Sequence, residues 1–419
     1  MRILSRWTIA DMVFLYRQDD RGAVELVALP GQLEEQMVDN EQQTADSLVQ
    51  LKLIGDPYAL GFSQGRTLRN SGTTQLLRLV GQRERGNTIV TELTDGRGHT
   101  LLHELERRET GAAVRTTFVN QSAAEARLEL LASFSLGGIT PFDPADAPGT
   151  LVLHRMRSTW SMEGRLDSQP VEELQLEPSW SRYAANSLRY GQAGSMPVKG
   201  FYPFAAVEDV RRGVTWAAQV AHPGSWQLEV YRRDNLLCLS GGLADHELGH
   251  WVKRVAPGES FTTPDALLTV CQGGVDEASA RLVEMHAYHP APVDRELPVM
   301  FNEFCTTWGN PTQENIARIA ARLKDKGLRY FVIDAGWYNA DGKGWERNMG
   351  DWRPNQGMFP EGIAQASAVI RENGMIPGLW FELEVCGQDA DAFQQTELLL
   401  HRDGVPVTTG IRRFWDFRQ

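Results

Sequence analysis

Residues 328–338 read LRYFVIDAGWY, and at their centre lies the apolar run Tyr330-Phe331-Val332-Ile333. A short unbroken run of this kind is typical of a strand that is covered on both faces, as in a parallel sheet. The run stops at Asp334, and Gly336 follows two residues later. The stretch therefore predicts one strand of a parallel α/β domain, with polar residues at its carboxyl end.

A helical pattern precedes this strand. Apolar residues spaced i, i+3, i+4 and i+7 are Ile316, Ile319, Ala320 and Leu323. Thr312 is a candidate N-cap, and Gly327 is the candidate C′ residue. We therefore expect a helix that packs one apolar face against the sheet.

A second helical pattern follows the strand. Ile363, Ala366 and Ile370 mark its apolar face, Gly374 ends it, and residues 375–381 form the next predicted strand. Strand, helix, strand, helix and strand in this order are typical of a parallel α/β domain.

The chain before residue 275 has a different period. In residues 114–119 and 226–230, apolar side chains alternate with others, so that Trp226, Leu228 and Val230 share one face and Gln227 and Glu229 the other. Such alternation predicts half-buried antiparallel strands. We expect a large antiparallel β-sandwich over residues 1–275 and a helical connector with a Pro-rich linker over residues 276–297. The α/β domain then covers residues 298–419.

Acidic and aromatic residues come together at the ends of two predicted strands: Asp334 and Trp337 after one, Trp380 and Glu382 after the other. Carboxylates accept hydrogen bonds from sugar hydroxyls, and an indole face covers the apolar face of a sugar ring. The pattern favours a sugar site at this edge of the sheet. Two alternatives remain at this point, a helix N-cap for Asp334 and core packing for the two tryptophans.

Four segments carry a family resemblance: Phe301–Phe304, Phe331–Tyr338, Met349–Trp352 and Gly378–Glu382. They resemble the first three barrel strands of glycoside hydrolase family 36, the bacterial-type α-galactosidases. Upstream, Trp160–Arg165 and Ser240–Gly242 resemble the sandwich of that family. The resemblance implies a complete antiparallel β-supersandwich over residues 1–275, followed by the first three or so βα units of an incomplete (β/α)8 TIM barrel. It also implies release of terminal α-galactose from oligosaccharides with retention of configuration, and a possible homo-oligomer, since several members are tetramers.

The resemblance also implies substrate-binding residues. The acid that binds galactose hydroxyls corresponds to Asp334, and the tryptophan that lines the galactose pocket corresponds to Trp380. The aromatic residue after the first strand corresponds to Phe304, and a sugar-contacting arginine corresponds to Arg412. Trp337 belongs to the same motif and completes the predicted substrate-binding set. Many members have a second acid where this chain has Ala335, which puts one hydroxyl contact and the sugar preference in doubt.

The catalytic residues of the family are not found in this sequence. The family nucleophile lies in a Lys-x-Asp-x-Asn motif, and the nearest string here is Arg233-Asp234-Asn235, which lacks the lysine. Residues 298–419 are also too few for a closed barrel, which needs at least ~200 residues. We therefore expect the nucleophile and the acid/base beyond Gln419, and the 419-residue chain alone to be inactive. A substitute catalytic pair would be Asp334 with Glu382.

Three functions stay open on this reading: an α-galactosidase seen incompletely, a non-catalytic sugar-binding protein, and one half of a split enzyme. No cofactor and no metal are expected. A net charge of −12 argues against a nucleic-acid or anionic membrane partner, because phosphate binding depends on clustered Lys and Arg. The four cysteines, at positions 238, 271, 305 and 386, form neither a disulfide framework nor a zinc site.

The segment His246-Glu247-Leu248-Gly249-His250 matches the zinc-protease motif H-E-x-x-H. That chemistry needs both histidines on one helical face, whereas Gly249 and the flanking strand patterns predict an exposed strand or loop here. The first residues, 1–18, do not resemble a signal peptide, and no apolar run is long enough to span a membrane. A cytoplasmic location is the resulting expectation.

Overall fold

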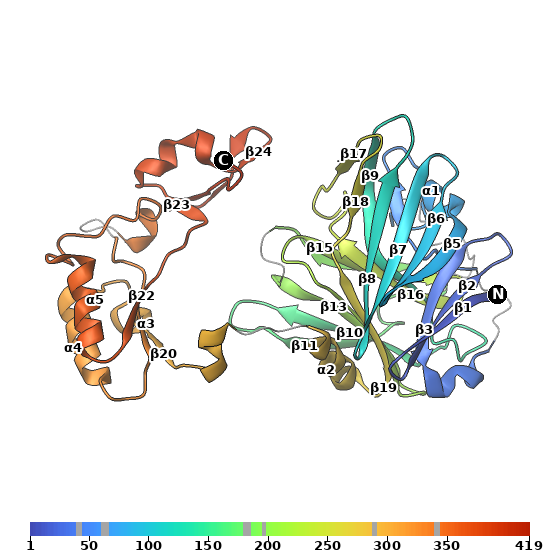
Figure 1. Cartoon of the computed structure of the whole chain (residues 1–419), viewed down its shortest axis with the longest axis horizontal. Coiled ribbons are helices and arrows are strands. Elements are labelled where there is room, and N and C mark those ends of the chain that lie inside the picture. Colours follow the sequence, from blue (N-terminus) through green and yellow to red (C-terminus); the bar gives the residue numbers. More distant parts are fainter. Residues whose placement is uncertain (39–43, 60–66, 179–185, 195–197, 287–290, 339–343) are drawn as a thin grey trace. The chain divides into compact units, whose positions relative to one another are not determined.

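The structure, a computed structural model, describes residues 1–38, 44–59, 67–178, 186–194, 198–286, 291–338 and 344–419. The chain divides into two units, Met1–Ala287 and Tyr288–Gln419 (Figure 1). Residues 287–290, part of the predicted Pro-rich linker, lie outside the described residues.

The first unit consists mainly of three antiparallel sheets, as the alternating pattern predicts. The smallest has the order β1 (Arg2–Ile9), β2 (Met12–Gln18), β3 (Val24–Pro30). The ten-stranded sheet has the order β11 (Arg165–Pro170), β10 (Leu151–Ser158), β13 (Gly200–Asp209), β14 (Val214–Val220), β19 (Ala266–Gln272), β8 (Gly111–Asn120), β7 (His99–Arg108), β6 (Thr88–Thr94), β5 (Arg78–Arg85), and β18 (Ser260–Thr262) also pairs with β8. The six-stranded sheet has the order β12 (Ser187–Gln192), β15 (Trp226–Arg233), β16 (Leu236–Leu243), β9 (Ala126–Ile139), β17 (Lys253–Val255), and β4 (Leu51–Leu53) also pairs with β9.

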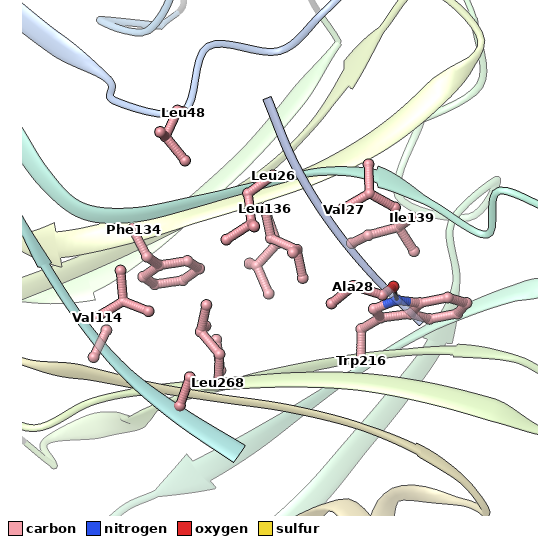
Figure 2. Close-up of a cluster of buried hydrophobic side chains, with 14 of the residues drawn as sticks. Leu26, Val27, Ala28, Leu48, Val114, Phe134, Leu136, Ile139, Trp216 and Leu268 are labelled. Atoms are coloured by element: carbon pink, nitrogen blue, oxygen red, sulfur yellow. Dashed lines mark hydrogen bonds between the residues drawn. The ribbon is translucent and has the colours of Figure 1, made fainter. Parts of the chain in front are cut away.

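One large apolar core joins the three sheets. It includes Leu26 of β3, Val114 of β8, Phe134 of β9, Trp216 of β14 and Leu268 of β19, all fully or nearly fully buried (Figure 2). The indole Nε1 of Trp216 donates a hydrogen bond to the carbonyl oxygen of Ala28 at 2.6 Å, which satisfies its polar atom inside the core. Burial of so many aliphatic and aromatic side chains makes this core the main source of stability for the unit.

Strand β15 departs from the prediction. The sequence pattern places Gln227 and Glu229 on a polar face opposite Trp226, but all three side chains are fully buried. The reason is Arg69, also fully buried, which forms an ion pair with Glu229 and donates to Oε1 of Gln227 at 2.8 Å. A buried charged group is tolerated where it is paired and hydrogen-bonded, so both faces of β15 are covered.

The described part of the first unit also has three helical segments: η1 (Gly31–Gln36), α1 (Gly72–Leu76) and α2 (Val275–Met285). Helix α2 is the predicted connector, and it packs through Ala278, Leu282 and Met285 in a second apolar cluster with residues of β14 and β19.

The second unit contains the predicted parallel sheet, which confirms the α/β assignment. Its order is β20 (Met300–Asn302), β21 (Tyr330–Ile333), β22 (Ile376–Leu379), with both pairs parallel. Helix α4 (Gln313–Leu323) connects the first two strands, and helix α5 (Gly362–Glu372) connects the last two. Phe331 and Ile333 of the sheet pack in one core cluster with Ile316 of α4 and Ala366 of α5.

The predicted helix ends are partly right. The side chain of Thr312 caps α4 by accepting from the backbone N–H of Asn315 at 3.2 Å. Helix α4 ends earlier than predicted, however, because Lys324 is the C-cap and Asp325 takes the left-handed conformation at φ 60°. Asp is among the residues that tolerate this conformation, so Gly327 is not the C′ residue. Gly374, at φ 83° after the C-cap of α5, does end its helix as predicted.

The remaining elements are short. They are η2 (Pro292–Glu296), α3 (Phe304–Thr307), η3 (Trp345–Arg347), η4 (Asp391–Gln394), η5 (Thr396–Leu398), a small antiparallel sheet of β23 (Val385–Gly387), β27 (Arg412–Phe414) and β26 (Thr408–Thr409), and the hairpin β24 (His401–Arg402) and β25 (Val405–Pro406). None of the helices in the described ranges is long and apolar enough to cross a membrane.

Candidate functional site

The parallel register brings three residues to one edge of the sheet. Glu303 follows β20, Asp334 follows β21 and Trp380 follows β22. The backbone N–H of Glu303 donates to Val332 at 3.2 Å, and that of Trp380 donates to Ile333 at 2.9 Å. Hydrogen bonding between the strands therefore continues to the point where these side chains begin, at the carboxyl ends of the strands.

Asp334 is held in place by three contacts. Its Oδ2 accepts from Nδ2 of Asn302 at 2.6 Å, its Oδ1 accepts from the backbone N–H of Ala335 at 2.6 Å, and its own backbone N–H donates to Oε1 of Glu303 at 2.9 Å. Its side chain is largely buried, with the residue 7% exposed. Residues 335–338 form a turn rather than the first turn of a helix, so the N-cap alternative for Asp334 is wrong.

Glu303 supports Asp334 from the neighbouring strand. Its carboxyl is fully buried, and the hydroxyl of Thr307 donates to its Oε2. Burial raises the pKa of Glu303, although the hydrogen bonds from Thr307 and from the backbone of Asp334 oppose the increase. The sequence interpretation gave Glu303 no role. Its position directly after a strand, like that of Asp334, is the signal that could have identified it.

Trp337 lies in the core of the second unit. It is 2% exposed, its ring stacks on Trp352 at 6.0 Å between centroids, and its Nε1 donates to the carbonyl oxygen of Trp380 at 2.9 Å. The packing alternative therefore describes what Trp337 does in this structure, and a sugar contact by Trp337 stays a prediction. Its hydrogen bond instead fixes the backbone that carries the partly exposed Trp380.

Trp345 connects the other predicted residues, although the sequence interpretation missed it. Its ring lies edge-on to Phe304 at 5.8 Å and to Trp380 at 6.1 Å, and the guanidinium of Arg412 lies 5.8 Å from its centroid. Arg412 also donates to Oε1 of Glu382 at 3.2 Å. The structure thus joins Phe304, Trp380 and Arg412 through one indole ring. No local pattern marks Trp345, which begins the short helix η3 and does not directly follow a strand.

Gly336 allows the loops after β20 and β21 to touch. It has φ 109°, and a Cβ atom at this position would lie 2.1 Å from the carbonyl oxygen of Gly309. Only glycine fits this conformation and this separation. The turn that presents Asp334 therefore depends on a glycine two residues later.

The proposed substitute pair does not share a direct contact in the structure. Asp334 is bonded to Asn302, and Glu382 is bonded to Arg412. The carboxyl that touches the Asp334 backbone is Glu303, so the two candidate acids have different surroundings.

The H-E-x-x-H segment forms no metal site. Residues 246–249 lie in a bend and turn, as the loop prediction required, and Leu248 donates its N–H to Oδ1 of Asp245 at 2.7 Å. Across the described ranges, no group of three or more His, Cys, Asp or Glu side chains is arranged to hold a metal ion.

Known proteins share both the sequence and the fold. The family profile described as Melibiase matches residues 260–412. A probable α-galactosidase C from Aspergillus terreus is 26% identical over 332 residues, which cover 71% of this chain and 39% of that protein. The α-galactosidase Mel36A from Lactobacillus acidophilus is 25% identical over 197 residues, covering 46% of this chain and 26% of that protein.

Two solved structures match along nearly the whole chain. The GH36 α-galactosidase AgaB from Geobacillus stearothermophilus has a TM-score of 0.74 at 18% identity, covering 99% of this chain and 60% of that one. A variant of the GH36 α-galactosidase AgaA from the same organism, in complex with stachyose, has a TM-score of 0.75 at 18% identity and covers 99% and 61%. These likenesses show that the fold is part of the GH36 fold. The sequence of this chain is therefore similar to those of α-galactosidases, and its fold to part of the GH36 α-galactosidase fold.

The chain spans about 60% of the solved GH36 chains and less than two fifths of the length of the curated relatives above. Next to Asp334, Ala335 is 1% exposed and offers only a methyl group. The hydrogen-bonding capacity at the end of β21 therefore rests on Asp334 alone.

Proposed function

We propose that this chain supplies the galactose-recognition part of an α-galactosidase-like retaining glycoside hydrolase, which releases terminal α-galactose from oligosaccharides. The observation that carries the proposal is that Asp334 and Trp380 directly follow two neighbouring parallel strands, and that Trp345 contacts both Trp380 and Arg412. Crystal structures of AgaA variants with stachyose and raffinose support an α-galactoside as the ligand class.

Asp334 keeps hydrogen-bonding capacity for a sugar. A carboxylate has about four acceptor positions. Asn302 and the N–H of Ala335 use one position each on the two oxygens. The remaining positions can accept from neighbouring hydroxyls of a galactose ring, and a charge-assisted hydrogen bond of this kind is worth about 1.5–3 kcal/mol.

Trp380 and Arg412 would complete the recognition. The partly exposed indole of Trp380 offers an apolar face to the C–H groups of the ring. Arg412, held by Glu382, supplies N–H donors for a ring or linkage oxygen. No cofactor is needed, because hydroxyl recognition and glycoside hydrolysis use only carboxyl, guanidinium and indole groups.

The proposed chemistry requires two further carboxyls. In a retaining mechanism one carboxylate attacks the anomeric carbon while a carboxylic acid, about 5–5.5 Å away, protonates the leaving oxygen, and water then hydrolyses the glycosyl-enzyme intermediate. The family's Lys-x-Asp-x-Asn motif is not found in this sequence, so we assign neither group to a residue of this chain. The chain by itself would then bind the sugar and leave the glycosidic bond intact.

The test is hydrolysis of an aryl α-galactoside by the purified, sequence-verified 419-residue protein. We expect no turnover above the buffer control. Turnover that disappears in Asp334→Asn and Glu382→Gln variants would contradict the proposal and establish these two acids as a catalytic pair. The DNA downstream of codon 419 separates the alternatives, since an in-frame Lys-x-Asp-x-Asn segment supports the proposal. A stop codon combined with activity restored by a second chain would support a split enzyme instead.

A further inference from the structure

A cavity in the first unit is lined by three arginines. It has a volume of about 210 Å³ and lies among Arg21 in the turn between β2 and β3, Arg78 at the start of β5, and Arg233 at the end of β15. The chain as a whole carries a net charge of −12. Three positively charged guanidinium groups around one cavity therefore differ from the acidic charge of the chain.

None of the described residues that line this cavity is acidic. Arg78 donates to the backbone carbonyl oxygens of Gln75 and Leu77, both at 2.8 Å, so these two contacts position it without neutralising its charge. The Nε atom of Arg233 is buried and has no hydrogen-bond acceptor in the described part of the chain. A buried donor without an acceptor is costly, which is a reason to expect a ligand atom at this point.

The third arginine, Arg21, is largely exposed, and the cavity wall between the arginines is polar. Arg21 has one contact with Asp19, at 3.3 Å, and its side chain is 62% exposed. The wall between the arginines carries Ser47 and Thr74 hydroxyls and the Asn70 amide. Hydroxyl and amide groups can also donate hydrogen bonds to anionic oxygens.

The buried acids behind the cavity already have donors. Asp46 accepts from Tyr231 at 2.7 Å and from Ser135 at 2.8 Å, and Glu25 is paired with Arg17 at 2.6 Å. Burial raises the pKa of Asp46, although the charge of Arg233 opposes the increase.

The geometry points to a binding site for a phosphate group at this cavity, with Arg233 and Arg78 as its principal ligands and Arg21 as a mobile third. Arginine forks match the oxygens of a phosphate and bind them through paired charge-assisted hydrogen bonds. The cavity has room for a phosphate together with part of a small hydroxylated molecule. The ligand is therefore inorganic phosphate or the phosphate of a phosphorylated sugar. This site lies in the β unit and does not depend on the proposed galactose site.

Isothermal titration of the 419-residue protein with inorganic phosphate, galactose 1-phosphate and galactose tests the proposal. We expect both phosphates to bind, with affinity that falls as salt concentration rises, and Arg233→Gln and Arg78→Gln each to weaken binding at least tenfold. Tighter binding of galactose 1-phosphate than of inorganic phosphate would identify a phosphorylated sugar as the ligand.

Arg211→Gln is the matched control. Arg211 is an exposed arginine of the same unit whose contact with Asp143 is 3.5 Å long, and its loss should leave phosphate binding unchanged. Circular dichroism of each variant excludes misfolding as the cause of lost binding. The proposal is overturned if neither phosphate binds, or if Arg211→Gln weakens binding as much as Arg233→Gln.

Discussion

The two units differ in how completely their strands are paired with neighbouring strands. In the β unit, the central strands pair on both sides and their inward side chains meet in one core that includes Trp216. In the α/β unit, β21 pairs on both sides, but β20 and β22 each pair on one side only in the described part of the chain. Met300 of β20 is 59% exposed and Ile376 of β22 is 46% exposed.

This difference assigns stability mainly to the β unit and the proposed sugar recognition to the α/β unit. The β unit buries its apolar surface by itself, and no predicted sugar-binding residue lies in it. The α/β unit holds Asp334, Trp380 and Arg412 but leaves apolar side chains and backbone groups of its outer strands open to pairing with another chain. We therefore expect substitutions in the first unit to change folding and substitutions in the second to change sugar binding.

The largest effect is expected in the core of the β unit. Replacing the fully buried Trp216 by alanine should lower the free energy of unfolding by about 3–5 kcal/mol, because the cavity and the lost contacts add. The control is Trp160→Ala, since Trp160 is 89% exposed and its loss should cost within about 0.5 kcal/mol. Urea unfolding followed by circular dichroism measures both. Equal effects would mean that the core does not carry the stability of this unit.

In the α/β unit, Asp334→Ala should weaken galactose recognition by about 1.5–3 kcal/mol, which is roughly ten- to hundredfold. The measurement is kcat/KM for an aryl α-galactoside in a longer polypeptide that completes the barrel. Asp403→Asn is the control, because Asp403 lies in the turn between β24 and β25 with an almost fully exposed side chain. Unchanged kcat/KM in the Asp334 variant would show that this residue only holds the turn.

Glu303→Ala should loosen the end of β21. The variant leaves the N–H of Asp334 without its acceptor, at a cost of about 1–3 kcal/mol. Hydrogen exchange of the peptide that contains residues 330–338 should then become about five- to hundredfold faster. Glu303→Gln keeps an acceptor oxygen and should change exchange little. Equal acceleration in both variants would show that the charge, rather than the acceptor, matters.

The effect of pH on the stability difference between the parent protein and the Glu303→Gln variant is expected to be smaller. Burial raises the pKa of Glu303 above its ordinary value of 4.5, so the folded unit holds a proton here more tightly than the unfolded chain does. The contribution of Glu303 to stability is therefore full below its unfolded pKa and is lost as pH rises through the folded value. Compared at each pH by hydrogen exchange, Glu303→Gln should gain stability relative to the parent as pH rises. A constant difference would refute the raised pKa.

The sequence predicts those features that depend on local period. The alternation of Val114, Thr116 and Phe118 corresponds to buried positions of β8, and the polar residues after apolar runs lie at one sheet edge. Prediction from the sequence fails where residues that are distant along the chain come into contact. Arg69 buries Glu229 from 160 residues away, and no local pattern shows this.

The same limit applies to the candidate site. Strand-end position predicts Asp334 and Trp380, because parallel strands bring their carboxyl ends together. Trp345 connects Phe304, Trp380 and Arg412 only after the loop that carries it folds across the sheet edge. The acid that supports Asp334 is also determined by tertiary contacts. In the structure, Glu303 rather than Glu382 accepts the hydrogen bond from the backbone N–H of Asp334.

Limited proteolysis of the 419-residue protein, with mass spectrometry of the fragments, tests the contrast between the two units most directly. We expect aggregation, or trimming to a stable β-rich fragment that ends between residues 287 and 298. The open edges of β20 and β22 are the physical reason, because they leave the α/β unit with fewer satisfied backbone groups and less buried apolar surface. A monodisperse monomer in which residues 298–419 resist the protease as strongly as residues 1–275 would contradict the account, since the three-stranded sheet would then be closed in another way.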